Sequence, residues 1–226
     1  MISRFTEKFS RTGRAIIAAF GDSVTEGYFE SREGMHGIKD GEAVYTNVLG
    51  RMISAAFPDR RIDVVNAGKG GDTAYLALSR LYSDVVSRSP DLVIVCFGLN
   101  DVTGSLQKYI DSLSRIFMGV RETGADAVFM TPNMLNTAVT SPILTEVSAK
   151  LAEAQISGHM DEFMENAVSL AQKHGAYICD CYSIWKAMYK AGADINALLA
   201  NRINHPSRMM HGLFAAELFK TIFAGD

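Results

Sequence analysis

The sequence lacks any long apolar run without charges. Nowhere do ~18 uncharged apolar residues follow one another, as a membrane-spanning helix requires. The N-terminal run MISRFTEKFSRTGR is interrupted by Arg, Glu and Lys, so it has no continuous apolar stretch of the kind that secretory signals contain. We therefore expect a chain without stable membrane insertion or an export signal, located in the cytoplasm.

Cysteine is also scarce, and charge of one sign is not in excess. The three cysteines, Cys96, Cys179 and Cys181, form an odd set without a repeated C-x-x-C spacing, which argues against a disulfide framework and against a zinc site. We expect buried free thiols.

The net charge of -3 and the pI near 6.0 leave no basic stripe for a phosphate backbone, so nucleic acid is excluded as a partner.

No internal repeat, low-complexity tract or Pro/Gly-rich linker divides the 226 residues. Hydrophobic residues make up 48%, which is enough for a sizeable buried core. We therefore expect residues 1–226 to form a single domain. The sequence carries no prediction of the oligomeric state.

Apolar runs of strand length alternate with segments of helical spacing. The predicted strands are Ala15–Phe20, Ile62–Asn66, Leu92–Phe97, Ala127–Met130 and Ala176–Cys179. The predicted helices are Val44–Phe57, Thr73–Ser87, Ser105–Thr123, Glu146–His174 and Ser207–Phe223. Continuous apolar runs are typical of strands covered on both faces, so this order predicts a doubly wound α/β fold with a five-stranded parallel sheet. In such a sheet, ligands bind at the carboxyl ends of the strands.

Each of the first three predicted strands runs into a polar turn that contains glycine. The turns are Phe20-Gly21-Asp22-Ser23, the run from Asn66 to Thr73 (NAGKGGDT), and Phe97-Gly98-Leu99-Asn100-Asp101. A serine at a strand-to-helix turn can present its hydroxyl to the crevice, although a Gly-Asp-Ser tripeptide by itself is also an ordinary helix cap. The side-chain amide of Asn100 and the late His205-Pro206 pair supply a hydrogen-bond donor and a base, and this combination favours nucleophilic catalysis.

The second turn resembles phosphate-binding loops only superficially. Its glycines do not follow the G-x-x-x-x-G-K-[ST] order of a P-loop, and Thr73 stands where G-x-G-x-x-G needs its third glycine. A flavodoxin-like nucleotide or phosphate binder is a minor alternative.

The segments GDSVTEGY, NAGKGGDT, GLND and NHP together resemble the four sequence blocks of the SGNH (GDSL-type) hydrolases, and the resemblance spans about residues 15–215. It implies a three-layer α/β/α sandwich with a flavodoxin-like sheet and an ester-hydrolysing activity that needs neither a metal nor a cofactor. Carried over by position, Ser23 is the nucleophile and His205 the base. The backbone N–H groups of Ser23 and Gly71 and the side-chain amide of Asn100 form the oxyanion hole.

The resemblance fails at one position. The family commonly has an Asp three residues before the catalytic His, and this chain has Arg202 there. A backbone carbonyl, Asn201 or an acid from elsewhere such as Asp194 could orient His205 instead. As supporting residues we expect Asp22 and Asp101, which brace their turns by accepting backbone N–H groups, and Asn204. His211 is expected to pack or cap.

Two long connections, Tyr28–Ala43 and Thr131–Thr145, are expected to shape the binding site. Neither has the composition of a long apolar groove. We therefore expect a small-molecule ester substrate with a short acyl chain, such as an O-acetyl group on a carbohydrate. The alternatives are a lysophospholipase or thioesterase acting on lipid acyl groups, and a catalytically silent carbohydrate-binding relative.

Overall fold

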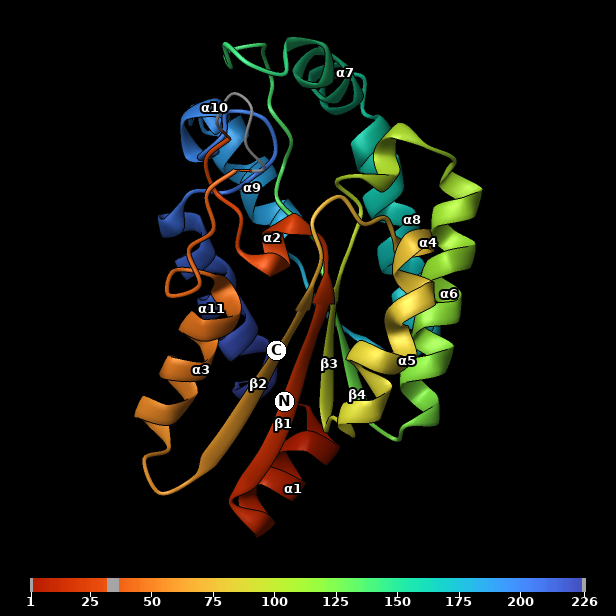
Figure 1. Ribbon diagram of the computed structural model, residues 1–226, viewed down its shortest axis with the longest axis vertical. Coiled ribbons are helices and arrows are strands. Elements are labelled where there is room, and N and C mark those ends of the chain that lie inside the picture. Colours follow the sequence, from red (N-terminus) through yellow and green to blue (C-terminus); the bar gives the residue numbers. More distant parts are fainter. Residues whose placement is uncertain (1, 32–36, 225–226) are drawn as a thin grey trace.

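The computed structural model describes residues 2–31 and 37–224, and within them lies a five-stranded sheet with strand order β2-β1-β3-β4-β5 (Figure 1). The strands are β1 (Arg14–Gly21), β2 (Arg61–Gly68), β3 (Leu92–Cys96), β4 (Asp126–Met130) and β5 (Tyr177–Cys179). All neighbouring strands pair in parallel. The predicted doubly wound, flavodoxin-like sheet is confirmed, and its strand order reverses direction between β1 and β3, where such folds bind ligands.

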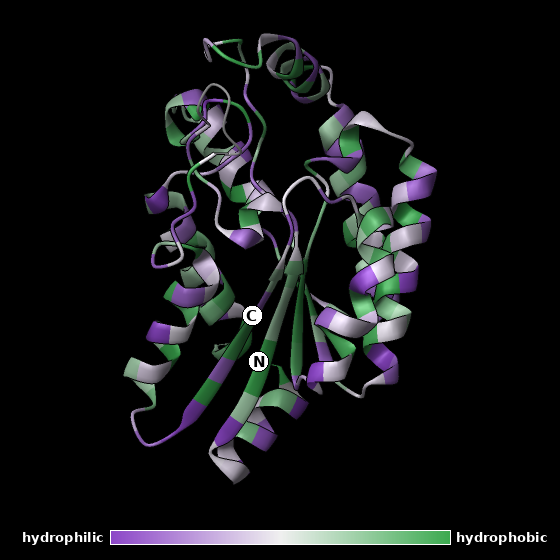
Figure 2. Ribbon diagram, viewed as in Figure 1, coloured by the Kyte–Doolittle hydropathy of each residue, from purple (hydrophilic) through white to green (hydrophobic). Residues whose placement is uncertain are grey.

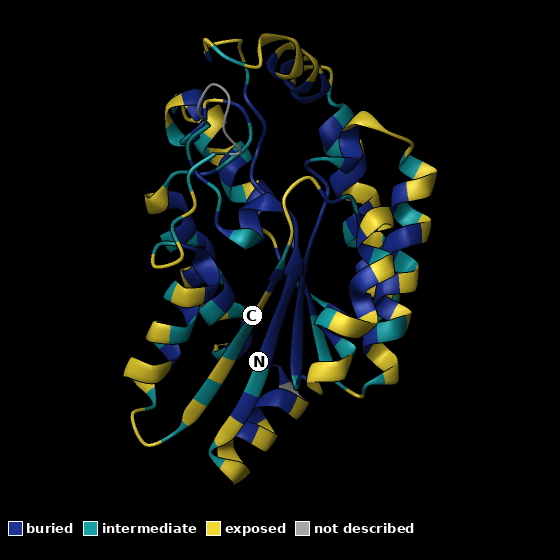
Figure 3. Ribbon diagram, viewed as in Figure 1, coloured by how far each residue is buried: buried dark blue, intermediate teal, exposed yellow. Residues whose placement is uncertain are grey.

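The sheet is buried at its centre and more open at its β2 edge. Every residue of β3 is buried, whereas residues of β2 alternate between exposed and half-buried positions (Figure 3). Figure 2 shows the same contrast in hydropathy, with the central strands mostly apolar. The expectation of strands covered on both faces therefore holds for the centre but is wrong for β2, because an edge strand has a covering helix mainly on one side.

Helices cover both faces of the sheet and form the predicted three-layer sandwich (Figure 1). On one side α3 (Tyr45–Ala56) packs against α11 (Arg208–Phe223); on the other, α6 (Leu106–Glu122) packs against α4 (Ala74–Ala77) and α8 (His159–Lys173). The remaining helical segments are α1 (Ser3–Thr12), α2 (Ser23–Glu26), η1 (Leu78–Arg80), α5 (Leu81–Asp84), η2 (Val86–Arg88), η3 (Asp101–Thr103), α7 (Thr145–Ile156), α9 (Cys181–Lys190) and α10 (Ile195–Leu198).

Two predicted helices are broken. The segment Thr73–Ser87 consists of four short helical pieces, and its backbone leaves the helical region at Arg80, where φ is -117°. The segment Glu146–His174 divides into α7 and α8 at Gly158, whose φ of 83° ends a right-handed helix. Helical periodicity continued across both breaks, so the apolar pattern alone did not mark them.

Helices α1 and α9 were not predicted. The apolar residues Phe5 and Phe9 of α1, and Ile2 just before it, are buried, although four of the ten residues of the helix are charged. In α9, Tyr182 and Trp185 are buried. Both helices are short amphipathic segments, and the helical spacing of their apolar residues was the signal that could have found them.

All three cysteines are free and buried, as predicted. Among residues 2–31 and 37–224, no helix is both long and apolar enough to cross a membrane.

Candidate active site

Ser23 is the first residue of α2, and only Asp22 separates it from the end of β1. The chain can turn this sharply because Gly21 has no side chain: a Cβ there would lie 2.1 Å from Thr25 Oγ1 and 2.8 Å from the Cys96 carbonyl oxygen. Asp22 caps α2, since its Oδ1 accepts the Val24 N–H at 2.9 Å. Ser23 is thus held at the carboxyl edge of the sheet, beside the point where the strand order reverses.

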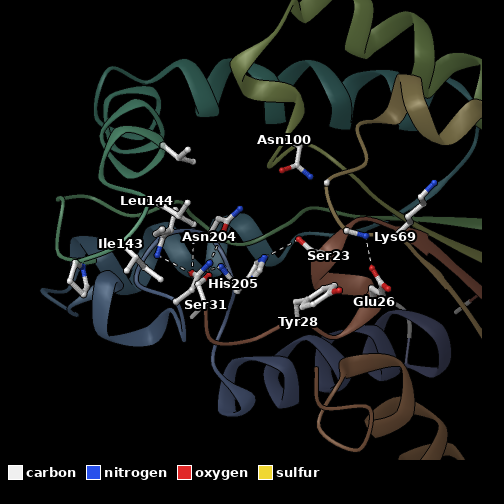
Figure 4. Close-up of a pocket in the computed structure, with 16 residues that line it drawn as sticks. Ser23, Glu26, Tyr28, Ser31, Lys69, Asn100, Ile143, Leu144, Asn204 and His205 are labelled. Atoms are coloured by element: carbon white, nitrogen blue, oxygen red, sulfur yellow. Dashed lines mark hydrogen bonds between the residues drawn. The ribbon is translucent and has the colours of Figure 1, made fainter. Parts of the chain in front are cut away.

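His205 comes from the opposite end of the chain and contacts this serine. Its Nε2 lies 3.0 Å from Ser23 Oγ, and its Nδ1 lies 3.0 Å from the carbonyl oxygen of Phe29 (Figure 4). Burial lowers the pKa of His205 below its usual value of 6.5, with the Phe29 carbonyl opposing the shift. A carbonyl oxygen can only accept, so the neutral ring carries its hydrogen on Nδ1 and turns the lone pair of Nε2 toward the serine hydroxyl.

The loop that carries His205 is braced by Asn201. The Oδ1 of this side chain accepts the backbone N–H groups of Ile203, Asn204 and His205, at 2.9–3.0 Å. Asn204 returns a contact, because its Oδ1 accepts a hydrogen bond from Asn201 Nδ2 at 2.9 Å. Asn201 therefore fixes the loop rather than the imidazole.

Neither of the two charged residues considered beside His205 orients its ring. Arg202 is exposed, with a left-handed backbone (φ 62°). Asp194 caps α10 by accepting the Ala197 N–H at 3.1 Å. Of the alternatives that the sequence left open, the backbone carbonyl, that of Phe29, is the group in contact with Nδ1.

Three hydrogen-bond donors line the same cleft as Ser23. They are the backbone N–H groups of Ser23 and Gly71, which have no acceptor among the described residues, and the side-chain amide of Asn100. Asn100 Nδ2 donates one hydrogen to the Asp72 carbonyl at 2.8 Å, and this bond ties the turn after β3 to the turn after β2. Gly71 has a left-handed φ of 77°, which side-chain-bearing residues rarely adopt.

Two buried carboxyl groups lie next to these donors in sequence. Asp101 Oδ1 accepts the Ala74 N–H at 2.9 Å, while its buried Oδ2 has no partner among the described residues. Burial raises the pKa of Asp101 and of Asp22 to about 7, and the negative charge of neighbouring aspartates adds to both shifts. Near neutral pH both carboxyls are thus partly protonated, which limits negative charge close to Ser23.

Arg80 is a buried cation that sequence reasoning missed. Its guanidinium donates to the carbonyl oxygens of Gly21 at 2.9 Å and Ala67 at 2.6 Å, and to Asp72 Oδ2 at 2.6 Å. One side chain thereby joins the carboxyl ends of β1 and β2 to the turn that carries Gly71. The sequence signal was a single Arg on the apolar face of a helical segment, a position that requires a partner.

A cleft of about 970 Å³ surrounds Ser23 and His205. In Figure 4, Ile143 and Leu144 lie on the side of His205 away from Lys69 and Glu26. Both predicted binding connections reach it, through Tyr28 and Ser31 and through Pro142, Ile143 and Leu144, while residues 32–36 of the first connection lie outside the described residues. The charged side chains of Lys69 and Glu26 therefore lie at one end of the cleft, and the apolar side chains of Ile143 and Leu144 lie nearer the other.

His211 lies apart from this chemistry. It is buried in α11, and its Nδ1 accepts the N–H of Tyr45 at 3.1 Å, the first residue of α3. Burial lowers the pKa of His211 to about 3, so it packs as a neutral ring. Across the described parts of the chain, no three His, Cys, Asp or Glu side chains cluster so as to hold a metal ion.

The parallel sheet and the cleft at its carboxyl edge define an α/β protein with a serine–histidine pair in a candidate active site, and comparison with known families gives the particular group. The model of the GDSL-like Lipase/Acylhydrolase family matches residues 19–213. The chain therefore belongs to this family, and the resemblance to SGNH hydrolases is confirmed.

Solved structures show the same fold at low sequence identity. An acetylxylan esterase from Geobacillus stearothermophilus is 22% identical, with a TM-score of 0.72 over 92% of this chain and 94% of its own. A lipase/acylhydrolase from Enterococcus faecalis is 23% identical, with a TM-score of 0.70 over 92% and 95%. An α/β hydrolase enzyme from the metagenome of Lake Arreo, Spain, is 21% identical, with a TM-score of 0.71 over 94% and 96%. Among curated proteins, no relative matches the chain.

Proposed function

We propose that the chain is a serine ester hydrolase in which Ser23 is the nucleophile and His205 the general base. The observation that carries this proposal is the pair of contacts of the His205 ring, with Nε2 3.0 Å from Ser23 Oγ and Nδ1 3.0 Å from the Phe29 carbonyl oxygen. A neutral ring with its hydrogen on Nδ1 can accept only at Nε2, which faces the hydroxyl to be activated.

In the first half of the reaction, Ser23 Oγ attacks the acyl carbon of the ester while its proton moves to His205 Nε2. The carbonyl oxygen becomes an oxyanion, which the N–H groups of Ser23 and Gly71 and the amide of Asn100 stabilise. When the carbon–oxygen bond to the alcohol breaks, the alcohol oxygen takes the proton from Nε2. The acyl group is left on Ser23.

In the second half, water attacks the acyl carbon and gives a proton to His205 Nε2. The same three donors hold the second oxyanion. Collapse of this intermediate releases the carboxylic acid, and Ser23 Oγ recovers its proton from Nε2. The phenylalanine carbonyl accepts the Nδ1 hydrogen throughout, and thereby keeps the ring in one orientation.

For the substrate, we propose an ester of a short acyl group, such as an O-acetyl group on a carbohydrate. The apolar side chains at the cleft are those of Pro142, Ile143, Leu144, Val147 and Ile203, and of these Leu144 and Val147 are exposed to solvent. The polar part, with Glu26 and Lys69, suits a hydroxylated alcohol. The fold of the acetylxylan esterase from G. stearothermophilus, whose name specifies an acetylated polysaccharide, is in line with this choice.

A series of p-nitrophenyl esters from acetate to octanoate tests the substrate class. We expect kcat/KM to be as high for acetate or butyrate as for octanoate, because the apolar side chains at the cleft cannot cover a long chain. A CH₂ that stays in water contributes none of the about 0.8 kcal/mol that its burial would give. Release of acetate from acetylated xylooligosaccharides, followed by coupled acetate assay, extends the test to the sugar.

Rising kcat/KM up to octanoate would instead support a lipid acyl hydrolase, for which the exposed Leu144 and Val147 at the cleft would bind the chain. Carbohydrate binding without any ester turnover would support the catalytically silent relative. The Ser23–His205 contact speaks against the latter, because a binding module has no need for a base beside its serine.

The pH dependence of kcat/KM tests the role of His205. As a general base the ring must be neutral, so activity rises with pH through its pKa and is lost below it. Because burial lowers that pKa, we expect the midpoint of the acid limb to lie below 6.5, measured with a short-chain ester between pH 4 and 8. A single acid limb with its midpoint above 6.5 would contradict the lowered pKa of His205 and would point instead to the carboxyls of Asp22 or Asp101, whose pKa values lie at about 7.

A further inference from the structure

The group that contacts His205 Nδ1 is a main-chain carbonyl, and its position depends on the backbone that carries it. Phe29 lies on a short hairpin-like connection in which Tyr28 and Lys39 form an antiparallel bridge. The Phe29 N–H donates to the Ile38 carbonyl at 2.9 Å, and the Ile38 N–H donates to the Glu30 carbonyl at 2.8 Å. These bonds join the two arms of the connection, residues 28–30 and residues 38–40, to each other. They do not join either arm to the segment that carries His205.

The side chain of Arg208 joins both arms to the segment that carries His205. It lies at the start of α11, three residues after His205. Its Nε donates to Asp40 Oδ2 at 2.7 Å, and its Nη1 and Nη2 donate to the two carboxylate oxygens of Glu30 at 2.5 and 3.3 Å. Its Cζ also lies 4.5 Å from the centre of the Phe29 ring. A single guanidinium thus contacts both arms of the connection and the residue whose carbonyl faces His205.

Glu30, Asp40 and Arg208 remain charged at neutral pH. The hydrogen bonds from Arg208 hold the pKa values of Glu30 and Asp40 below their usual values, and the two carboxylates raise the pKa of Arg208. All three side chains are partly exposed, so they contribute little to global stability. Their effect is instead on local geometry.

We propose that Arg208, paired with Glu30 and Asp40, is a positioning residue that replaces the missing carboxylate of the family by fixing the Phe29 carbonyl against His205 Nδ1. This inference rests on the proposed role of His205 as the base. In the common family arrangement, an acidic side chain near His touches the ring directly. Here the residue three positions before His205 is the exposed Arg202, and a cation three positions after it holds a carbonyl in place.

The contacts of Arg208 with Glu30 and Asp40 are called the clamp below, and the substitution Arg208→Gln removes them. We expect kcat to fall about tenfold with KM within twofold, because a small displacement of a catalytic group lowers the rate without changing substrate contacts. Arg208→Lys should recover only part of the loss, since an ammonium cannot bridge two carboxylates with the planar fork of a guanidinium. The matched control is Arg61→Gln, which breaks the exposed pair with Asp63 at the opposite end of β2 and should leave kcat unchanged.

Two further measurements separate positioning from a merely structural role. In the Glu30→Gln/Asp40→Asn background, Arg208→Gln should cause no additional loss, because the three residues act as one unit. In NMR spectra, the His205 Nδ1 hydrogen should exchange faster with solvent in Arg208→Gln than in the wild type. Unfolding midpoints of Arg208→Gln and Arg61→Gln should be shifted by similar amounts.

The outcomes are distinguishable. If the wild type hydrolyses esters but Arg208→Gln matches Arg61→Gln in kcat and in Nδ1 exchange, the clamp is disproved while the proposed function stands. If Arg208→Gln lowered kcat in the Glu30→Gln/Asp40→Asn background as much as it does in the wild type, the clamp would also be disproved, because Arg208 would then act through another contact. If the wild type itself hydrolyses no ester, the proposed function fails first.

Discussion

Replacing Ser23 by Ala should lower kcat for p-nitrophenyl acetate by a factor on the order of 10⁴–10⁶, because it removes the atom that forms the acyl-enzyme. The cleft and its donors remain, so a small rate above background should persist. The wild type should also release a burst of p-nitrophenol before steady state, and a fluorophosphonate probe should label Ser23, as read by mass spectrometry. The variant should show neither the burst nor the label.

The control for this substitution is Ser87→Ala, which removes an exposed serine hydroxyl from η2. Its turnover should equal that of the wild type. Circular dichroism should be the same for all three proteins, since the one hydrogen bond of the Ser23 hydroxyl within the described residues, to His205, supports no helix or strand. Equal rates for the wild type and Ser23→Ala would disprove the assignment of the nucleophile.

The second large effect is expected at Asn100. Replacing it by Ala should lower kcat by about 10²–10³-fold with little change in KM, because one oxyanion donor is worth about 2.7–4 kcal/mol in the transition state and little in the ground state. Asn100→Asp should be at least as slow, since a carboxylate donates no hydrogen bond and repels the oxyanion. Steady-state kinetics on a short-chain ester measures both variants.

Asn100 also donates to the Asp72 carbonyl, so a bracing role must be separated from an oxyanion role. Loss of bracing alone would displace the turn that carries Gly71 and would raise KM as well as lower kcat. The matched control is Asn166→Ala, an exposed position on α8 whose amide donates to the Glu162 carbonyl. A value of kcat for Asn100→Ala within threefold of that for Asn166→Ala would remove Asn100 from the oxyanion hole.

Much of the site was accessible from the sequence because its side chains follow strand ends in short motifs. Parallel strands bring their carboxyl ends to one edge, so the turns after β1, β2 and β3 meet wherever such a sheet forms. The glycine in Gly21-Asp22-Ser23 is required by the close approach of Thr25, and such a local constraint leaves a local signature. Ser23, Gly71, Asn100 and His205 accordingly line one cleft in the structure.

The sequence was less informative where long-range contacts override the local pattern. The segment Thr73–Ser87 has helical periodicity, yet it breaks at Arg80, whose guanidinium reaches the carbonyls of Gly21 and Ala67. Those acceptors lie on two other strands. A pattern read along one segment contains no information about them.

By itself, the sequence indicated the class of fold, and its resemblance to the SGNH hydrolases pointed to a candidate nucleophile, candidate donors and a candidate base, because each is a residue type at a fixed place after a strand or in the last motif. Only the tertiary structure decided what faces the second nitrogen of His205. That group is the carbonyl of Phe29, 176 residues away, held by the ion pairs of Arg208. Every residue has a backbone carbonyl, so no residue type marks the one that orients a ring, and its position follows only from the folded chain.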